Sequence, residues 1–239
     1  MSKSRQPDSG YSLVELLVAT VLFTIIAGTI FSLLFSAQLR YSSESGLTTA
    51  FQQANVAIDQ ITRDIHSAGY PRPSSFAPSP PAPPTDPRLM ALPFSWSPGY
   101  PNTPCTVNGS CGAVPGDYDL ILETDTGDGN GVQWIRYSLQ GTTLMRGMTK
   151  KQRFADPVAV TSAGVMLPYL DNVVNVTNPP GNNAVPIFAY RYDCNQPLPS
   201  EPSNICKVNI ALIVQAAQPD PQTGQFRTIR LTGQAALFN

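Results

Sequence analysis

The feature that most constrains this chain is a run of twenty residues, 16–35, that contains no charged residue and no proline. At about 1.5 Å per residue, a helix of this length is about 30 Å long, which matches the hydrocarbon thickness of a bilayer. Lys3 and Arg5 precede the run, and the next basic residue is Arg40. Because basic residues favour the cytoplasmic side, we expect a single-pass protein with a cytoplasmic N-terminus and the rest of the chain outside.

Two simple interpretations of this run leave part of the sequence unexplained. A secretory signal peptide has an apolar core of roughly 7–15 residues followed by a small-residue cleavage site. Here the run is longer, and residues 38–43 offer no such site. A plain membrane anchor fits the length but does not account for Glu15, because a carboxylate at the edge of a span is costly and usually has a partner or a function.

The residues around Glu15 form a motif. The string GYSLVE at residues 10–15 leads directly into the apolar run. This string closely resembles the class III signal of type IV prepilins. The resemblance implies that a prepilin peptidase cleaves after Gly10, which removes a leader of residues 1–10, and that the new N-terminal residue, Tyr11, is methylated. Family members usually have phenylalanine at that position, so Tyr11 is a departure that keeps the aromatic ring.

The same resemblance implies a role for Glu15 and a set of partners. Cleavage frees an amine that Glu15 of a neighbouring subunit neutralises in the apolar filament core, where an unpaired carboxylate would be costly. The expected partners are other pilins or pseudopilins through the helix, the prepilin peptidase and the inner-membrane assembly platform. The expected path leads from the inner membrane, with a periplasmic head, to a pilus or pseudopilus at the cell surface.

The helical pattern continues beyond the apolar run. Apolar residues recur in alternating steps of four and three, which is typical of an amphipathic helix: Leu47, Phe51, Ala54, Ile58, Ile61, Ile65 and Ala68. Polar residues, Asp64 among them, are expected on the other faces. Gly69 and the Tyr70–Pro71 step supply a stop, so a helix is predicted from Ser12 to Ala68 within a helical segment 11–69. A coiled coil has the same periodicity and is the structural alternative.

The end of this helix adds a second resemblance. Residues 62–73 read TRDIHSAGYPRP, which is similar to the end of the first helix in PilW-like minor pilins and in J-type pseudopilins of type II secretion. The resemblance implies a structural subunit, a minor pilin that helps to initiate or cap a type IV pilus. A J-type pseudopilin of a type II secretion system is one alternative. A DNA-uptake or adhesive module at the filament tip is another.

Half of the 24 prolines lie between Pro71 and Pro104. Proline lacks a backbone donor and fixes φ, so residues 70–104 cannot form a helix interior or a central strand. We expect a connector that lies over the head. A docking motif for a partner, anchored by Phe94, Trp96 and Tyr100, is the alternative.

Strand-forming segments dominate residues 105–239, the expected globular head. Strands are predicted at residues 119–123, 132–139, 143–146, 173–177, 187–192, 207–216 and 226–237. Residues 125–131, between the first two segments, are typical of a hairpin turn. Antiparallel strands after one long helix predict an α+β fold in which the helix stripe covers a sheet face. This agrees with the pilin-like fold that the resemblance implies.

The four cysteines are confined to the head and fall into two local pairs, Cys105 with Cys111 and Cys194 with Cys206. Neither pair has CxxC spacing, and a chain with one histidine is poorly supplied for a zinc site. Two disulfides in an oxidising compartment are expected. Three connectivities are possible, and sequence proximity favours the two local bonds.

The hairpin turn contains a weak candidate for calcium binding. Asp125, Asp128 and Asn130 offer hard oxygen ligands. Their spacing misses the D-x-[DN]-x-[DN]-G pattern, and no glutamate follows at the required offset. A plain hairpin turn is therefore favoured, and no metal is expected.

Four basic residues lie close together in the sequence: Arg146, Lys150, Lys151 and Arg153. They are candidates for contact with the phosphates of nucleic acid or lipid. The net charge of −1 gives no global attraction to nucleic acid, and no aromatic residue is interleaved for stacking. Solvated surface is the favoured interpretation.

No sequence motif points to catalysis. The chain has no nucleophile elbow, no P-loop and no dinucleotide fingerprint. A single histidine leaves little material for acid–base or nucleophilic chemistry. We therefore expect neither an enzyme nor a cofactor.

Overall fold

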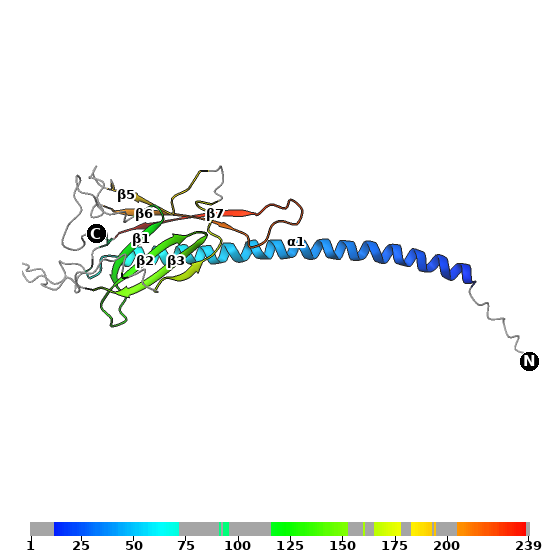
Figure 1. Cartoon of the computed structure of the whole chain (residues 1–239), viewed down its shortest axis with the longest axis horizontal. Coiled ribbons are helices and arrows are strands. Elements are labelled where there is room, and N and C mark those ends of the chain that lie inside the picture. Colours follow the sequence, from blue (N-terminus) through cyan, green and yellow to red (C-terminus); the bar gives the residue numbers. More distant parts are fainter. Residues whose placement is uncertain are drawn as a thin grey trace, which may run out of the picture.

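One long helix projects from a β-rich head, and the N-terminal end of the helix lies far from the head (Figure 1). The computed structural model describes residues 12–71, 91, 93–95, 116–152, 160, 165–177, 183–192, 194 and 205–237. The molecule therefore has two parts, a stalk and a head, that share one helix.

The helix α1 (Leu13–Ser67) contains 55 residues and is roughly 80 Å long at the standard rise. The predicted helix from Ser12 to Ala68 is confirmed to within one residue at each end. The helix stops where Gly69 adopts a φ of 80°, which glycine reaches without the steric penalty of a Cβ. The Gly69 N–H donates to Glu123 O at 2.7 Å, so the chain turns directly onto the head.

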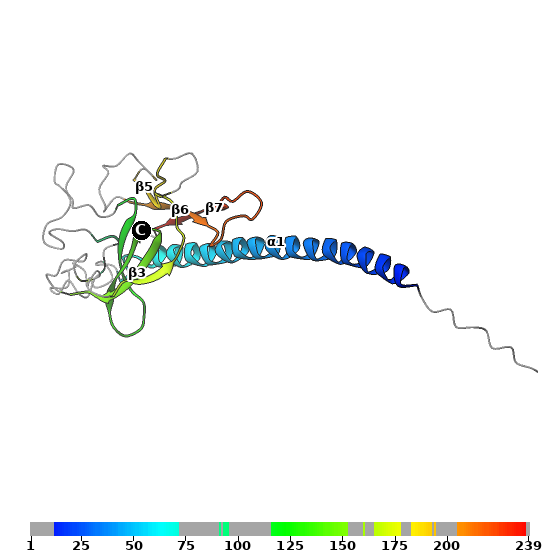
Figure 2. The same cartoon turned by 45° about the vertical axis from the view of Figure 1, so that its right-hand side comes forward.

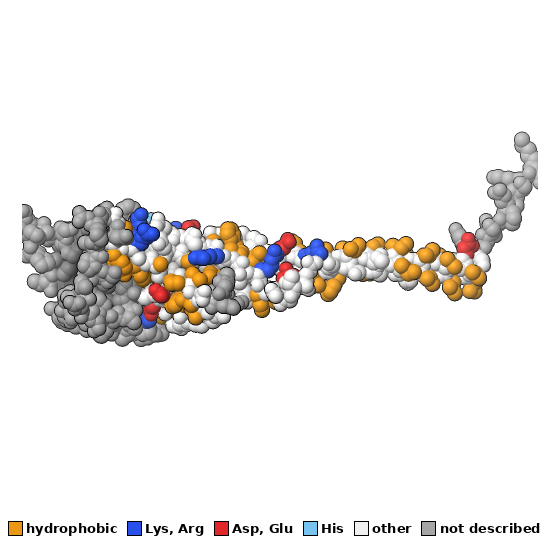
Figure 3. All heavy atoms as spheres, turned by 90° about the horizontal axis from the view of Figure 1, so that it is seen from above, with side chains coloured by type: hydrophobic (Ala, Val, Ile, Leu, Met, Phe, Trp, Pro, Cys, Tyr) orange, Lys and Arg blue, Asp and Glu red, His pale blue; other side chains and the backbone are white. Residues whose placement is uncertain are grey.

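The first half of α1 stands free of the head. Its large apolar side chains are well exposed, for example Phe23 at 71% and Phe35 at 65%. Figure 3 displays this part as a thin rod on which apolar side chains predominate. Within the described residues, α1 is the one helix long and apolar enough to cross a membrane. Such a rod needs lipid or other helices around it, because water does not favour this much exposed apolar surface.

The strands form two antiparallel sheets. The first sheet has the order β1-β2-β3-β4, formed by Asp119–Asp125, Val132–Gln140, Thr143–Lys150 and Leu167–Leu170. The second has the order β5-β6-β7, formed by Phe188–Arg191, Lys207–Gln215 and Thr228–Ala236. The predicted α+β, pilin-like arrangement is confirmed, and the strands divide between two sheets.

The strand predicted at residues 173–177 is wrong. The fourth strand is β4, and the chain then crosses from the first sheet to the second. Asn172 has a positive φ of 59°, which ends the extended backbone. The Val173 N–H donates to the β2–β3 turn and the Val174 N–H donates to β6, each at 2.8 Å. The Asn175 amide oxygen accepts from a backbone N–H of β6 at 2.9 Å, so the side chain holds a turn where a strand was expected.

The described part of the proline-rich connector lies on the head. Phe94 is 1% exposed and forms a bridge with Leu122, which covers the free edge of β1. Ser95 is also fully buried. Phe94 is therefore a core residue and not an exposed docking anchor. Trp96 and Tyr100 lie outside the described residues.

The second half of α1 packs across both sheets, chiefly against β7 and β6. Small residues allow a close approach. Ala54 and Ala57 are buried on the face of α1 that contacts the sheets. Gly233 of β7 lies opposite Ile58 of α1. A Cβ at Gly233 would lie 2.5 Å from Ile58 Cγ2, which is closer than real Cβ contacts. The seam between α1 and β7 therefore requires a glycine at this position.

The predicted apolar stripe of α1 is partly correct. Its members Ala54, Ile58, Ile61 and Ile65 are buried against the head. Phe51 is 46% exposed, because the buried face is turned toward Ala50 and Ala57. Asp64, predicted on a polar face, lies on this buried face and is 7% exposed. The stripe packs on the sheets within one chain, so a coiled coil is not needed to explain it.

Replacing Gly233 by valine tests the seam between helix and sheet. We expect Gly233→Val to lower the free energy of unfolding by about 1–3 kcal/mol, because the new side chain overlaps Ile58. Thr232→Val is the matched control, since Thr232 is exposed on the opposite face of the same strand, and a change within about 0.5 kcal/mol is expected there. Denaturant unfolding in detergent, followed by tryptophan fluorescence, measures both. Equal losses in the two variants would contradict this packing.

Candidate functional site

The N-terminal end of α1 presents an isolated carboxylate. Glu15 lies in the first turn and is exposed, with Leu13 at 80% and Leu16 at 64% exposure beside it. It has no ion-pair partner within the described residues. The positive end of the helix dipole favours a carboxylate here. Gly10 and Tyr11, the predicted cleavage and methylation positions, lie outside the described residues.

A buried polar cluster ties α1 to the first sheet. Asp64 Oδ2 accepts a hydrogen bond from the Tyr137 hydroxyl at 2.5 Å and one from Arg146 Nη2 at 2.9 Å. The Tyr137 oxygen in turn accepts from Arg146 Nε at 2.9 Å. The Arg146 guanidinium also lies 5.6 Å from the centre of the Tyr137 ring, in cation–π geometry. Each of the three groups therefore satisfies the other two.

Burial and the neighbouring charges raise the pKa values of Tyr137 and Arg146 in this cluster. Burial, with help from the charge of Asp64, raises the pKa of Tyr137 above its ordinary value of 10. Burial by itself lowers the pKa of Arg146, but Tyr137 and Asp64 outweigh it, and the net shift is upward. At neutral pH the phenol therefore donates and the guanidinium stays charged, which is the state that the hydrogen bonds require.

A second buried cluster surrounds Glu123, which is 0% exposed. Its Oε1 accepts from the Ser95 hydroxyl at 2.6 Å and from Trp134 Nε1 at 2.7 Å. Its Oε2 pairs with Lys151 Nζ at 2.7 Å. The carboxylate thus joins β1, β2, the residue after β3 and the described part of the proline-rich connector. Both oxygens are occupied, so Glu123 is built into the head as a structural group.

The described members of this basic group, Arg146, Lys150 and Lys151, do not share a surface. Arg146 pairs with Asp64, and Lys151 is 3% exposed on Glu123. Lys150 is exposed, and Arg153 lies outside the described residues. Successive residues of an extended chain point to opposite sides, which separates Lys150 from Lys151. Arg146 and Lys151 are therefore internal partners of carboxylates and do not form a phosphate-binding surface.

One of the two predicted disulfides is present. Cys194 and Cys206 are bonded, with their Cα atoms 6.2 Å apart. The Cys206 N–H donates to Arg191 O at 2.9 Å, so the bond closes a loop at the end where β5 and β6 pair. Cys105 and Cys111 lie outside the described residues, and their pairing stays a prediction.

The hairpin turn after β1 uses its acidic side chains internally. Asp125 Oδ1 accepts from the Gly127 N–H at 2.9 Å. Asp128 accepts from the backbone N–H and the side-chain amide of Asn130, each at 2.9 Å, and from Gln133 Nε2 at 2.7 Å. The Asn130 backbone bond, followed by the side-chain bonds, lowers the pKa of Asp128 to about 2. The described residues hold no group of three His, Cys, Asp or Glu side chains arranged for a metal.

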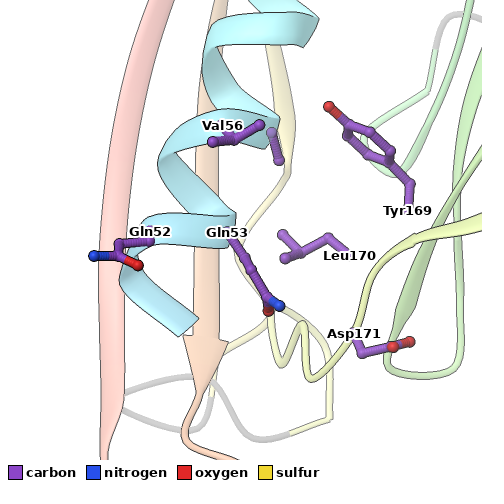
Figure 4. Close-up of a pocket in the computed structure, with 7 residues that line it drawn as sticks. Gln52, Gln53, Val56, Tyr169, Leu170 and Asp171 are labelled. Carbon is purple, nitrogen blue, oxygen red and sulfur yellow. The ribbon is translucent and has the colours of Figure 1, made fainter. Parts of the chain in front are cut away.

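A groove runs along the head beside α1. It has a volume of about 310 Å³ and lies between the helix and the chain around the end of β4 (Figure 4). Gln52, Gln53 and Val56 line it from α1, while Tyr169 and Asp171 line it from the sheet. Val56 is 62% exposed. The groove is a mixed polar and apolar surface next to the stalk.

Sequence reasoning missed the roles of Asp64 and Glu123. The partners of Asp64 lie 73 and 82 positions further along the chain, and the lysine that pairs with Glu123 lies 28 positions further. One local signal was available: Asp64 continues the alternating steps of four and three through Ala50, Ala54, Ala57 and Ile61. An aspartate in such a stripe indicates a buried ion pair.

The comparison with protein families gives one match. The model of the prokaryotic N-terminal methylation motif matches residues 5–31, which include Gly10, Tyr11, Glu15 and most of the apolar run. Comparisons with curated proteins and with solved structures found no match. The prepilin-type motif, the exposed apolar helix and the α+β head support a type IV pilin-like protein that is anchored in a membrane, a subunit of the pilin or pseudopilin type.

Replacing Lys151 tests the second cluster. We expect Lys151→Met to lower the free energy of unfolding by about 3–5 kcal/mol, because it removes a buried ammonium that pairs with the Glu123 carboxylate. Lys150→Met is the matched control, since this neighbour is exposed, and a change within about 0.5 kcal/mol is expected. Both are measured by denaturant unfolding in detergent. Similar values for the two lysines would rule out a special role for the buried pair.

Proposed function

We propose that this protein is a minor pilin of a type IV pilus and that it acts in filament initiation or in the tip complex. The observation that carries the proposal is the position of the prepilin-type motif. It covers the start of a 55-residue helix whose first half is exposed and whose second half is buried in the head. A subunit of this shape is anchored by its free rod in the membrane and contributes the same rod to a helical filament core.

Processing makes the two uses of the rod compatible. Cleavage after Gly10 removes Lys3 and Arg5, which would be costly to bury in an apolar filament core. The new amine would then belong to Tyr11, four residues before Glu15 in the sequence. A neighbouring subunit shifted along the filament axis brings its own amine to this carboxylate. Pairing is favoured only at matching heights, so it selects one register.

The assignment to the minor pilins rests on residues 62–73. Their Gly-Tyr pair lies at the junction between α1 and the head, where Tyr70 O accepts from the Asp125 N–H at 2.8 Å. The residues of this string therefore have a structural role, because they set the direction in which the chain passes from α1 into the head. A J-type pseudopilin of type II secretion would use the same junction, and identification of the partners distinguishes the two machines.

Mass spectrometry of the mature protein tests processing. We expect an N-terminus at Tyr11 that carries one methyl group, in cells that contain the prepilin peptidase. Peptidase-deficient cells supply the control, in which the leader of residues 1–10 is retained. An intact leader in normal cells would refute the proposal at its first step.

Replacing Glu15 tests assembly. We expect Glu15→Val to insert into the membrane normally but to fall at least tenfold in the sheared filament fraction, because its amine partner loses the charge that sets the register. Asp59→Val is the matched control, since Asp59 is exposed on the polar face of the same helix. Quantitative immunoblots of membrane and filament fractions measure both.

The same fractions identify the machine. Co-purified partners that are pilins support the pilus assignment, and partners that are all secretion pseudopilins replace it. Normal incorporation of Glu15→Val would show that the register is set elsewhere.

A further inference from the structure

The loop between β6 and β7, residues 216–227, is the part of the head that reaches furthest along α1 toward its N-terminal end (Figures 1 and 2). It contacts the helix by polar groups. The Ser42 hydroxyl donates to Gln218 Oε1 at 3.4 Å. The Gln222 amide oxygen, in the orientation that satisfies both groups, accepts from the Arg40 guanidinium. The loop thus rests on the helix just beyond the apolar run.

A cavity of about 180 Å³, here called the loop cavity, lies between this loop and the helix. It is lined by Arg40, Ser43, Glu44, Asp220, Pro221, Gln222 and Arg227. The lining therefore contains two guanidinium groups and two carboxylates. Arg227 Nε lies 4.0 Å from Asp220 Oδ2, which is too long for a hydrogen bond, so this pair leaves room for a further partner.

Ser43 is the unusual member of the lining. It is 7% exposed, and its hydroxyl has no hydrogen-bond partner within the described residues. A buried hydroxyl without a partner is unfavourable, and most such groups in proteins are satisfied. A hydroxyl in a cavity with two arginines is suited to donate to an oxyanion.

The height of the cavity along α1 indicates where that oxyanion comes from. Arg40 follows Phe35, the last residue of the apolar run, by five residues, which is about 7.5 Å of helix. Headgroups occupy roughly 5–7 Å on each side of the hydrocarbon core, so Arg40 lies at the outer edge of this layer, and Ser43 and Glu44 lie further out, about 12–13.5 Å past Phe35. Tyr41 is 76% exposed and Phe226 of the loop is 46% exposed, and aromatic residues concentrate at this level of a membrane.

We propose that the loop cavity binds the headgroup of an amine-bearing phospholipid, of the phosphatidylethanolamine class. Arg40, Arg227 and the Ser43 hydroxyl donate to the phosphate oxygens, and Glu44 and Asp220 accept from the ammonium group. The mixed charges of the cavity match a zwitterionic headgroup, whereas a free phosphate dianion would meet two carboxylates. Binding would hold the head against the periplasmic surface of the inner membrane before assembly. The proposal rests on the membrane span of α1 and not on the pilus role.

Lipid binding by the full-length protein tests this directly. Protein in maltoside micelles is titrated with a short-chain phosphatidylethanolamine, and the bound lipid is counted by native mass spectrometry. We expect Ser43→Ala to weaken binding about tenfold, because it removes a hydrogen bond to a charged group. Arg40→Gln should weaken it at least as much, and Arg40→Lys should restore part of the loss. Ser45→Ala, on an exposed part of the same helix, is the matched control and should bind as the wild type does.

Stability without lipid separates ligand binding from a structural role. In lipid-free micelles, Ser43→Ala should unfold at the same temperature as the wild type or higher, because its hydroxyl has no protein partner to lose. If Arg40→Gln unfolds the loop, Arg227→Gln replaces it in the titration.

Three results would overturn the proposal. The first is equal lipid binding by Ser43→Ala and Ser45→Ala. The second is displacement of the lipid by inorganic phosphate at the same concentration, which would make this a free-phosphate site. The third is equal affinity for phosphatidylcholine, whose headgroup has no N–H donor for Glu44 and Asp220. None of these results depends on filament formation, so the pilus role stands or falls separately.

Discussion

The head depends on the close contact between the second half of α1 and the two sheets. Ala54, Ala57 and Gly233 remove the side-chain bulk that would hold helix and β7 apart, and the apolar area buried along this seam stabilises the fold. At the end of the seam, Asp64 would be a buried charge without a cation if Arg146 did not reach it. The contact therefore requires both matched shape and matched charge, which specifies one rotation of the helix.

The surroundings of α1 change along its length. Apolar side chains are exposed through the first half, the β6–β7 loop contacts the helix by polar groups at Arg40 and Ser42, and the head covers it from Ala50 onward. An exposed apolar rod followed by a polar contact and a buried seam suits a protein that stands in a bilayer and carries its head outside. The same rod remains available to other helices, as a pilin- or pseudopilin-type subunit requires.

The long-range charge pairs were beyond sequence reasoning. Lys150 and Lys151 are adjacent and chemically identical, yet one is exposed and the other is buried on Glu123. Which of them points inward depends on the strand that precedes them and its pairing with β2, and no local pattern records that choice. Phe51 is a similar case, because its hydrophobicity predicted burial and the orientation of the whole helix left it exposed.

The sequence by itself determined the long helix, its glycine stop, the leader motif and most of the alternation of strands and turns, and it favoured the local disulfide between Cys194 and Cys206. These features depend on residues that are close together in the chain, so composition, spacing and backbone preference are sufficient to predict them. Only the tertiary structure decided that the strands divide into two sheets, that residues 173–177 cross between them, and that Asp64 and Lys151 point inward. Those outcomes depend on contacts between residues far apart in the sequence, and the free energy of such contacts exists only once the chain has folded.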